Sequence, residues 1–105
     1  MLLLVTLSVQ AQDKKKKNAS YDFEVNGHCT LCKKRIEKAA FSIAGVKSAN
    51  WNVDDHILHL IINEEKCSVL AVKKAVAAVG HDTDEVKAQD DVYAKLHGCC
   101  LYERK

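Results

Sequence analysis

Six short segments with the periodicity of strands or helices follow one another in this 105-residue chain, and their order limits the folds it can adopt. Residues 21–25 alternate apolar and polar side chains, which is the period of a half-buried strand, and Gly27 follows as a turn residue. From residue 30 to residue 44 apolar side chains recur at helical spacing opposite a lysine-rich face, and Gly45 ends that pattern. The first half of the chain therefore predicts one strand and one amphipathic helix.

The second half of the chain continues with a hairpin, a helix and a final strand. These segments are residues 46–53, 57–62, 69–79 and 83–88. Asp54-Asp55-His56 supplies the turn of the hairpin, Ser68 is placed to cap the helix, and Gly80 stops it. The predicted order is β-α-β-β-α-β, the arrangement of an α+β ferredoxin-like sandwich, with a short C-terminal extension.

The chain begins with an apolar segment that predicts export. Residues 1–11 carry no charged side chain and are too short to span a bilayer, and Val9-Gln10-Ala11 has the small-x-small pattern of a cleavage site. We therefore expect a signal peptide over residues 1–11 and a lysine-rich linker over 12–20. The folded domain is expected over 21–88, with a tail over 89–105. After removal of the signal peptide we expect no stable membrane insertion.

The charge balance argues against a nucleic-acid partner. Of 16 basic and 14 acidic side chains, Lys14–Lys17 and Asp13 precede the domain, so residues 18–105 keep 12 basic and 13 acidic ones. Phosphate contacts need a basic face, and a nearly neutral body does not predict one. The sequence also has no Ser-His-Asp set, phosphate-binding glycine loop or supported carboxylate pair. We therefore do not expect an enzyme.

Five cysteines carry the chemistry of the sequence: Cys29, Cys32, Cys67, Cys99 and Cys100. An odd number in an exported chain leaves at least one thiol without an internal partner, which favours metal binding or reactivity over a closed disulfide framework. Cys29 and Cys32 lie where the first strand leads into the first helix, and the positive end of the helix dipole favours their thiolate forms. Two thiolates on a small loop suit Cu(I), and with added ligands they suit Hg(II) or Zn(II).

The segment order and the cysteine motif together resemble the heavy-metal-associated domain, the module of copper chaperones and mercury carriers. The residues that carry this resemblance are Phe23, Val25, Cys29-x-x-Cys32, Ile36, Gly45-Val46 and Gly80. The resemblance implies that Cys29 and Cys32 bind a soft metal ion, with Cu(I) expected first. It also implies transfer of that ion to or from a partner protein with a dithiol site. With the expected signal peptide, the chain looks like periplasmic mercuric-ion carriers and exported copper-binding proteins, so we expect a periplasmic location.

The chain departs from the pattern of that family in two places. The usual loop reads Gly-Met-x-Cys-x-x-Cys, whereas here Gly27-His28 stands directly before Cys29, and the buried methionine that props the loop is missing. The adjacent Cys99 and Cys100 in the tail are also absent from the minimal domain. Both departures bear on the identity of the bound metal and on the number of its ligands.

Two further residues were assigned to opposite ends of the predicted fold from the strand directions. His81, in the loop after the second helix, is expected at the cysteine end. It is expected there as a third ligand, as a donor that steadies thiolate charge, or as a surface histidine beside the end of a helix. Cys67 precedes the second helix and is expected at the opposite end, as a small and partly buried side chain.

The tail is long enough to return its cysteines to the loop. Residues 89–99 span about 35 Å when extended, which exceeds the size of such a domain. Cys99 and Cys100 are then expected to complete a four-sulfur site with Cys29 and Cys32, to form disulfides with them, or to receive metal from another protein. The alternative is that they are unrelated thiols of a mobile tail.

Three functions follow from these patterns. The first is a soft-metal carrier, and the second is a structural zinc site that pins the tail through all four of these cysteines. The third is a thiol-disulfide oxidoreductase, because C-x-x-C at the start of a helix is also a redox motif. Thioredoxin-like enzymes carry a cis-proline that faces the cysteine pair, and this chain contains no proline. We therefore expect the carrier first and the oxidoreductase last.

Overall fold

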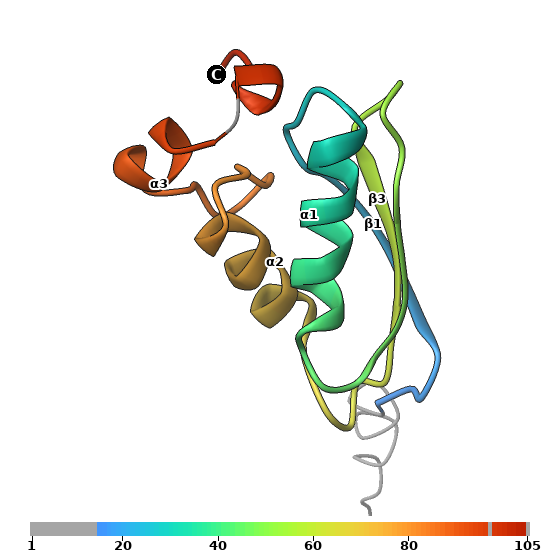
Figure 1. Ribbon diagram of the computed structural model, residues 1–105. Helices are drawn as coiled ribbons and strands as arrows, with labels where there is room; N and C mark the ends of the chain where they lie inside the picture. Colours follow the sequence, from blue (N-terminus) through green and yellow to red (C-terminus); the bar gives the residue numbers. More distant parts are fainter. Residues whose placement is uncertain (1–14, 97, 105) are drawn as a thin grey trace, which may run out of the picture.

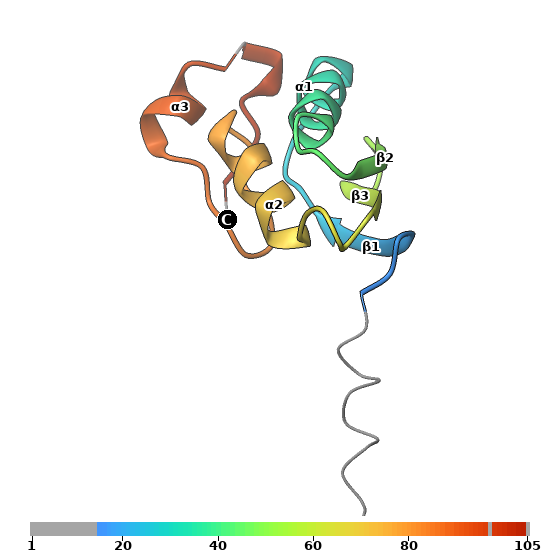
Figure 2. The same cartoon turned by 90° about the horizontal axis from the view of Figure 1, so that it is seen from below.

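A computed structural model describes residues 15–96 and 98–104 of the chain, without the side chain of Cys99. The expected signal peptide, residues 1–11, lies outside the described residues. The described part has two layers, an antiparallel sheet and two helices that cover one of its faces (Figure 1, Figure 2). The buried apolar side chains between these layers form the hydrophobic core.

The sheet contains three strands, and the last of them in sequence lies in the middle. The strands are β1 (Ala19–Glu24), β2 (Val46–Trp51) and β3 (Ile57–Ile62), in the order β1-β3-β2, and both outer strands run antiparallel to β3. In β3, Leu58 and Leu60 are buried whereas His59 and Ile61 are exposed, because successive side chains of a strand point to opposite faces. The predicted hairpin is confirmed.

The two long helices begin where the sequence patterns indicated, but the first ends three residues and the second one residue before its predicted end. They are α1 (Thr30–Phe41) and α2 (Val69–Ala78). The Ser68 hydroxyl accepts the N–H of Ala71 at 3.2 Å and so caps α2. Gly45 follows α1 with φ of 102° and Gly80 follows α2 with φ of 107°, a backbone region that favours glycine. Within the described ranges, no helix has the length and apolar character needed to cross a membrane.

The predicted final strand, residues 83–88, is reduced to a single bridge between Val25 and Thr83. The N–H of Thr83 donates to the carbonyl of Val86 at 2.8 Å, and the Thr83 hydroxyl accepts the N–H of Val86 at 2.8 Å. The N–H of Ala88 donates to the carboxylate of Asp82 at 2.7 Å. These local bonds satisfy the backbone groups that a fourth strand would have offered to β1. The α+β, ferredoxin-like class is confirmed, with its edge strand replaced by a turn.

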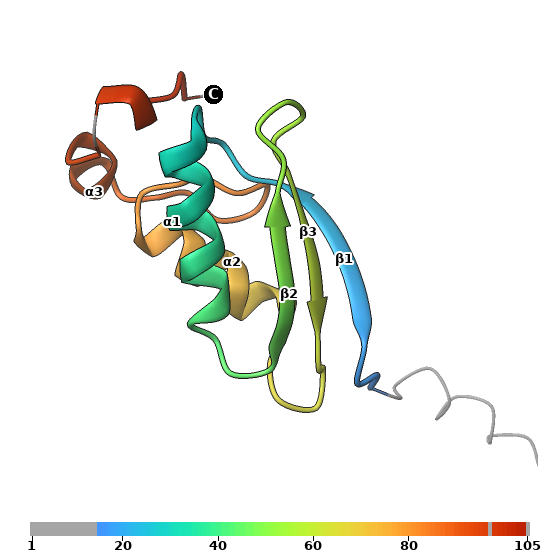
Figure 3. The ribbon, with the colours of Figure 1, turned by 45° about the vertical axis from the view of Figure 1, so that its right-hand side comes forward.

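The tail returns to the cysteine end of the domain. It contains α3 (Asp90–Ala94) and the 3-10 turn η2 (Gly98–Cys100). Figure 1 and Figure 3 both place η2 beside the N-terminal end of α1, so residues far apart in sequence are neighbours there. Among the described residues the tail therefore returns to the cysteine end, which its length allowed.

Candidate metal centre

The cysteine loop joins β1 to α1 and is fixed by hydrogen bonds to two other loops. The N–H of Val25 donates to the carbonyl of His56 at 2.8 Å, and the N–H of Asn26 donates to the carbonyl of Asp82 at 2.8 Å. The hairpin turn and the loop of His81 therefore both meet the cysteine loop, and for His81 this is the end that the strand directions predicted. Cys29 is the N-cap residue of α1, with extended backbone and no capping hydrogen bond from its side chain.

Three cysteine sulfurs converge at this end of the molecule. The Sγ atom of Cys29 lies 3.7 Å from that of Cys32 and 3.6 Å from that of Cys100. All three sulfurs lie within 4.8 Å of one another, and they form a group of metal-ligating atoms in the described part of the chain. The structure thus brings together the two loop cysteines and one of the two tail cysteines that the sequence offered. The side chain of Cys99 is outside the described residues.

The spacing of the sulfurs indicates how many ligands an ion would have. For a metal–sulfur bond of about 2.3 Å, two sulfurs are about 4.6 Å apart in linear, about 4.0 Å in trigonal and about 3.8 Å in tetrahedral coordination. The Cys29–Cys32 and Cys29–Cys100 separations of 3.7 and 3.6 Å are therefore shorter than a linear site requires. These two separations, both from Cys29, fit a site with three or four ligands, and the sulfurs of Cys32 and Cys100 lie within 4.8 Å of each other.

Cys100 is buried against the loop cysteines. Its side chain has no exposed surface, and burial, followed by its contacts with Cys32 and Cys29, raises the pKa of its thiol. Without an ion the Cys100 sulfur therefore keeps its proton. A bound cation would supply the charge that stabilises the thiolate, so binding of a metal ion here would release protons.

Trp51 forms the floor beneath the cysteine loop. Its indole N–H donates to the carbonyl of Val25 at 2.9 Å, and the side chain is fully buried. A Cβ atom at Gly27 would lie 3.0 Å from the Trp51 ring and 3.2 Å from the Cβ of Cys32. The indole therefore supports the cysteine loop from below, through Val25 and Gly27.

His81 lies beside the loop but outside the three-sulfur group. Its Nδ1 donates to the carbonyl of Asn26 at 2.9 Å, and its ring stacks on that of Tyr102 with centroids 5.7 Å apart. Burial, reinforced by the charge of Arg35, lowers the pKa of His81, so the ring is neutral near pH 7. Its Nε2 is buried and has no hydrogen-bond partner among the described residues. In this structure His81 supports the loop backbone, through Asn26.

Cys67, His56 and His59 lie outside the three-sulfur group. Cys67 is half-buried beside Gly45 at the opposite end, where burial raises the pKa of its thiol. His56 stacks on Trp51 with ring centroids 5.6 Å apart. His59 contacts Asp22 at 2.9 Å on the exposed face of the sheet. Cys67 has the position and the burial that the sequence predicted.

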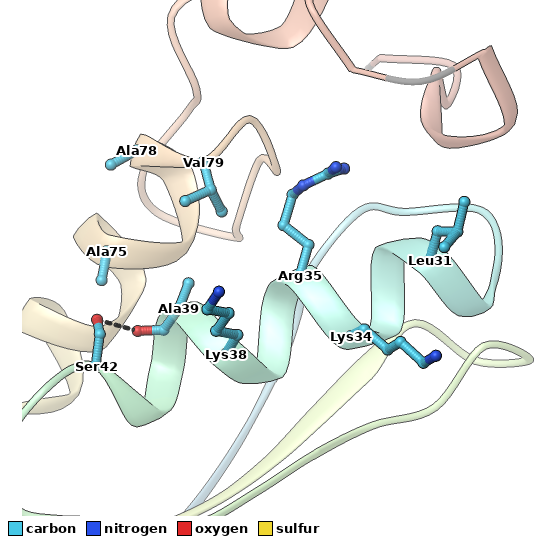
Figure 4. Close-up of a pocket in the computed structure, with 9 residues that line it drawn as sticks. All are labelled: Leu31, Lys34, Arg35, Lys38, Ala39, Ser42, Ala75, Ala78 and Val79. Carbon is cyan, nitrogen blue, oxygen red and sulfur yellow. Dashed lines mark hydrogen bonds between the residues drawn. The ribbon is translucent and has the colours of Figure 1, made fainter.

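A groove next to the cysteine loop carries positive charge. It has a volume of about 690 Å³ and lies between α1 and α2, with Ala39, Ala75 and Val79 among its apolar lining (Figure 4). Lys34, Arg35 and Lys38 line it from the α1 side. Leu31, which stands between the two loop cysteines, is 46% exposed at the same surface. A partner that approaches the sulfurs from this side meets an apolar surface bordered by cations.

The sequence did not identify the residues that hold the tail in place. Tyr102 is almost fully buried, and its hydroxyl donates to the carbonyl of Gly80 at 2.8 Å. Arg104 donates to both carboxylate oxygens of buried Asp82, at 2.8 and 2.9 Å. The sequence signal that could have indicated this anchoring is a tyrosine and an arginine just after the tail cysteines, because both residue types often make buried contacts.

Comparison with known proteins gives matches among solved structures. No protein-family model matches the chain, and no curated protein matches it. The CopZ metallochaperone is 29% identical, and the match covers 62% of this chain and 98% of that one with a TM-score of 0.60. The N-terminal domain of a potential copper-translocating P-type ATPase from Bacillus subtilis, in its Cu(I)-loaded state, is 26% identical. That match covers 69% of this chain and 99% of the other, with a TM-score of 0.60.

A third structure supports the fold alone. Oxidized MerP from Ralstonia metallidurans CH34 is 22% identical, and the match covers 64% of this chain and 94% of MerP with a TM-score of 0.61. Together the three matches share the two-layer arrangement described above. They confirm the fold that the sequence patterns predicted.

Proposed function

We propose that this chain, which carries a heavy-metal-associated-like domain, is a carrier that binds a soft metal ion and passes it to a partner protein. The observation that carries the proposal is the group of three cysteine sulfurs within 4.8 Å at the N-terminal end of α1. The fold adds support, because a metallochaperone and a Cu(I)-loaded ATPase domain share it. The ion is cargo, and the chain acts without catalysis.

Cu(I) is the ion that the site suits best. Thiolates are soft ligands that select Cu(I) strongly, and Cu(I) accepts two or three of them. Cys29 and Cys32 are the primary ligands in this proposal, because they lie 3.7 Å apart on one loop at the N-terminal end of α1. Hg(II) and Zn(II) are the second and third candidates, since both also bind thiolates.

The partner is proposed to have a dithiol site and an acidic docking surface. A second pair of thiolates can bind the ion before the first pair leaves, so transfer never requires a free ion. Lys34, Arg35 and Lys38 border the groove beside the loop, and opposite charge on a partner would steer the two sites together. Export to the periplasm is part of the proposal, supported by the apolar residues 1–11 of the sequence.

A competition titration tests the carrier function. The reduced full-length chain is titrated with Cu(I) against a coloured Cu(I) chelator, and we expect one ion per chain. The Cys29→Ser/Cys32→Ser variant should lose affinity by about a thousandfold or more, on the order of 4 kcal/mol. The matched control is Cys67→Ser at the other end of the fold, which should bind as the unmodified chain does. If the reduced chain binds neither Cu(I) nor Hg(II) nor Zn(II), the carrier proposal is wrong.

A structural zinc site is the second candidate, because two of the three sulfur separations are also compatible with it. The separations of 3.6 and 3.7 Å are close to the tetrahedral value of about 3.8 Å. A zinc site of this kind is closed, so it should hold Zn(II) through hours of exposure to a dithiol acceptor. A carrier should release its ion to that acceptor within minutes. The exchange time therefore separates the two functions.

A further inference from the structure

We propose that residues 98–104 form a clasp that supplies Cys100 as the third sulfur ligand of the metal ion, and that opening of this clasp sets the rate at which the ion leaves. The inference rests on the proposed soft-metal function of Cys29 and Cys32. It adds a ligand, and a means of control, that the C-x-x-C loop alone does not have.

The first observation is the position of Cys100 relative to the loop. Its Sγ lies 3.6 Å from that of Cys29, as close as Cys32 lies to Cys29 at 3.7 Å. Cys100 is fully buried, whereas tail residues Gly98 and Leu101 on either side of it are exposed. The tail therefore turns this thiol, and not its exposed neighbours, toward the two loop cysteines.

The second observation is the aromatic anchor that follows Cys100. The Tyr102 hydroxyl donates to the carbonyl of Gly80 at 2.8 Å and accepts the N–H of Asp82 at 2.9 Å. Its ring stacks on that of His81 and meets the ring of Tyr93 edge-on, with centroids 4.9 Å apart. These contacts hold Tyr102, two residues after Cys100, against the loop of Gly80 and Asp82. The carbonyl of Asp82 also accepts the N–H of Asn26.

The third observation is the ion pair at the end of the clasp. Arg104 donates to both oxygens of the Asp82 carboxylate, at 2.8 and 2.9 Å, and to the carbonyl of Ala88 at 2.7 Å. Asp82 has no exposed surface, and a buried carboxylate that loses its partner is left with a large desolvation penalty. Arg104 also lies over the ring of Tyr93, 4.7 Å from its centroid. The clasp is thus held by a bidentate charged pair rather than by a loose surface contact.

The N-terminal side of the clasp is held as well. Leu96 is buried against Gly80, where a Cβ atom would lie 2.9 Å from the Leu96 side chain. Cys100 therefore stands between two anchors, Leu96 before it and Tyr102 with Arg104 after it. The position of its sulfur follows from contacts that involve neither Cys29 nor Cys32.

Release of the ion follows as a ligand exchange. A thiol of the acceptor loses its proton and forms a sulfur–metal bond, while the bond between Cys100 and the metal breaks and the Cys100 sulfur takes up a proton. The remaining two bonds, to Cys29 and Cys32, are exchanged in the same way, and the oxidation state of the metal does not change. The clasp must open before the acceptor can take the place of Cys100, because the Cys100 sulfur is buried.

The first test counts the sulfur ligands. X-ray absorption of the Cu(I)-loaded full chain, in buffer without thiols or halides, should report three sulfur neighbours for the unmodified chain and two for Cys100→Ser. Cys67→Ser should leave the number at three. An unmodified chain with two sulfur neighbours, or an unchanged number in Cys100→Ser, would overturn the inference while leaving the carrier function intact. Loss of the third sulfur in Cys99→Ser, rather than in Cys100→Ser, would overturn it as well.

The second test measures the rate of transfer to a small dithiol acceptor. Arg104→Ala should speed release about tenfold, which corresponds to 1.4 kcal/mol. Lys95→Ala removes an exposed cation from the same tail and should leave the rate unchanged. Tyr102→Phe loses only the hydroxyl contacts, so it provides a milder opening of the clasp should Arg104→Ala fail to fold.

The double variant separates a gate from a general loss of stability. Cys100→Ser alone should release its ion quickly, and adding Arg104→Ala to it should give no further increase, because the clasp acts through Cys100. If the two substitutions instead multiply their effects on the release rate, Arg104 acts through stability alone, and the proposal that the clasp controls release is overturned. Faster release from Arg104→Ala, with three sulfur neighbours still present before release, supports it.

Discussion

The N-terminal ends of α1 and α2 are similar in sequence but differ in their surroundings. Cys29 is the N-cap residue of α1, and Cys67 directly precedes Ser68, the N-cap residue of α2. At α2 the serine hydroxyl caps the helix and the cysteine packs beside Gly45. At α1 the cap position is a cysteine, and two more sulfurs lie within 4.8 Å of it. A thiol at the positive end of a helix is therefore not enough to gather three sulfurs, which here requires the loop of Cys29 and Cys32 to meet the tail of Cys100.

The largest effect is expected at Trp51, which supports only the α1 end. Trp51→Ala removes a fully buried indole from beneath the cysteine loop and should cost about 3–5 kcal/mol in the free energy of unfolding. Trp51→Phe keeps a ring but loses the hydrogen bond to Val25, so it should cost less. Urea unfolding of the metal-free chain measures both. A loss below about 1 kcal/mol for Trp51→Ala would show that the loop does not depend on this floor.

The next largest effect is a loss of stability in acid, through the ion pair of Asp82 and Arg104 at the α1 end. Burial would raise the pKa of Asp82, but hydrogen bonds from Arg104 and the N–H of Ala88, with the charge of Arg104, lower it below its ordinary 3.8. The unfolded chain therefore takes up this proton more readily than the folded chain. The contribution of the pair is complete above pH 3.8 and is lost as the pH falls through the lower folded-state pKa.

This acid effect has a matched control. The difference in unfolding free energy between the unmodified chain and Asp82→Asn should shrink as the pH falls below 3.8. Asp54→Asn, an exposed carboxylate of the hairpin turn, should show a much smaller change. A constant difference across the acid range would mean that the Asp82–Arg104 pair does not link stability to pH.

Two glycine substitutions, one at each end of the fold, should differ in their effect on Cu(I) affinity. Gly45→Ala adds a side chain at φ of 102°, 3.0 Å from the Cys67 sulfur, and should cost about 1–3 kcal/mol in stability without changing Cu(I) affinity. Gly27→Ala places a methyl group 3.0 Å from Trp51 and 3.2 Å from Cys32, so it should weaken Cu(I) binding as well. Denaturation and chelator competition together measure both effects. A loss of Cu(I) affinity in Gly45→Ala would contradict the separation of the ends.

The smallest effects are expected from substitutions at the two N-cap positions. Ser68→Ala removes the side-chain cap of α2 and should lower stability by about 1 kcal/mol, with Cu(I) binding unchanged. Cys29→Ser introduces a good cap residue at α1 and should stabilise the metal-free chain by about 0.5 kcal/mol while it weakens Cu(I) binding. Opposite signs in thermal unfolding are the expected result. A destabilised Cys29→Ser chain would show that Cys29 contributes to the fold and not only to the site.

The local features of this fold could be predicted from the sequence. Gly45 and Gly80 mark helix ends because few residues other than glycine adopt their backbone angles. Ser68 marks a helix start because its hydroxyl replaces a missing backbone partner. The C-x-x-C spacing predicts two thiols at one end of α1, because residues three apart lie on the same face of a helix. Each of these signals is contained within a few residues of the chain.

The contacts that complete the site could not be predicted in the same way. The length of the tail permitted its return, but the position of Cys100 depends on Tyr102 and Arg104, whose partners are 22 residues away in sequence. The support from Trp51 likewise depends on β2 lying beneath a loop that precedes it by 26 residues, as the bond to Val25 shows. The prediction of a final strand was wrong because the side chains of Thr83 and Asp82 accept the backbone N–H groups that a strand would have paired with its neighbour.

The proximity of Cys29 and Cys100 has a consequence for the whole chain. They are 71 residues apart in sequence, so an ion bound to both would act as a removable cross-link around most of the domain. A permanent cross-link around a loop of that length restricts the unfolded chain by about 4 kcal/mol. Loading the ion would then brace the entire molecule against unfolding and against proteolysis of its tail. Handing the ion over would remove that brace, so an empty carrier would be the form most open to degradation.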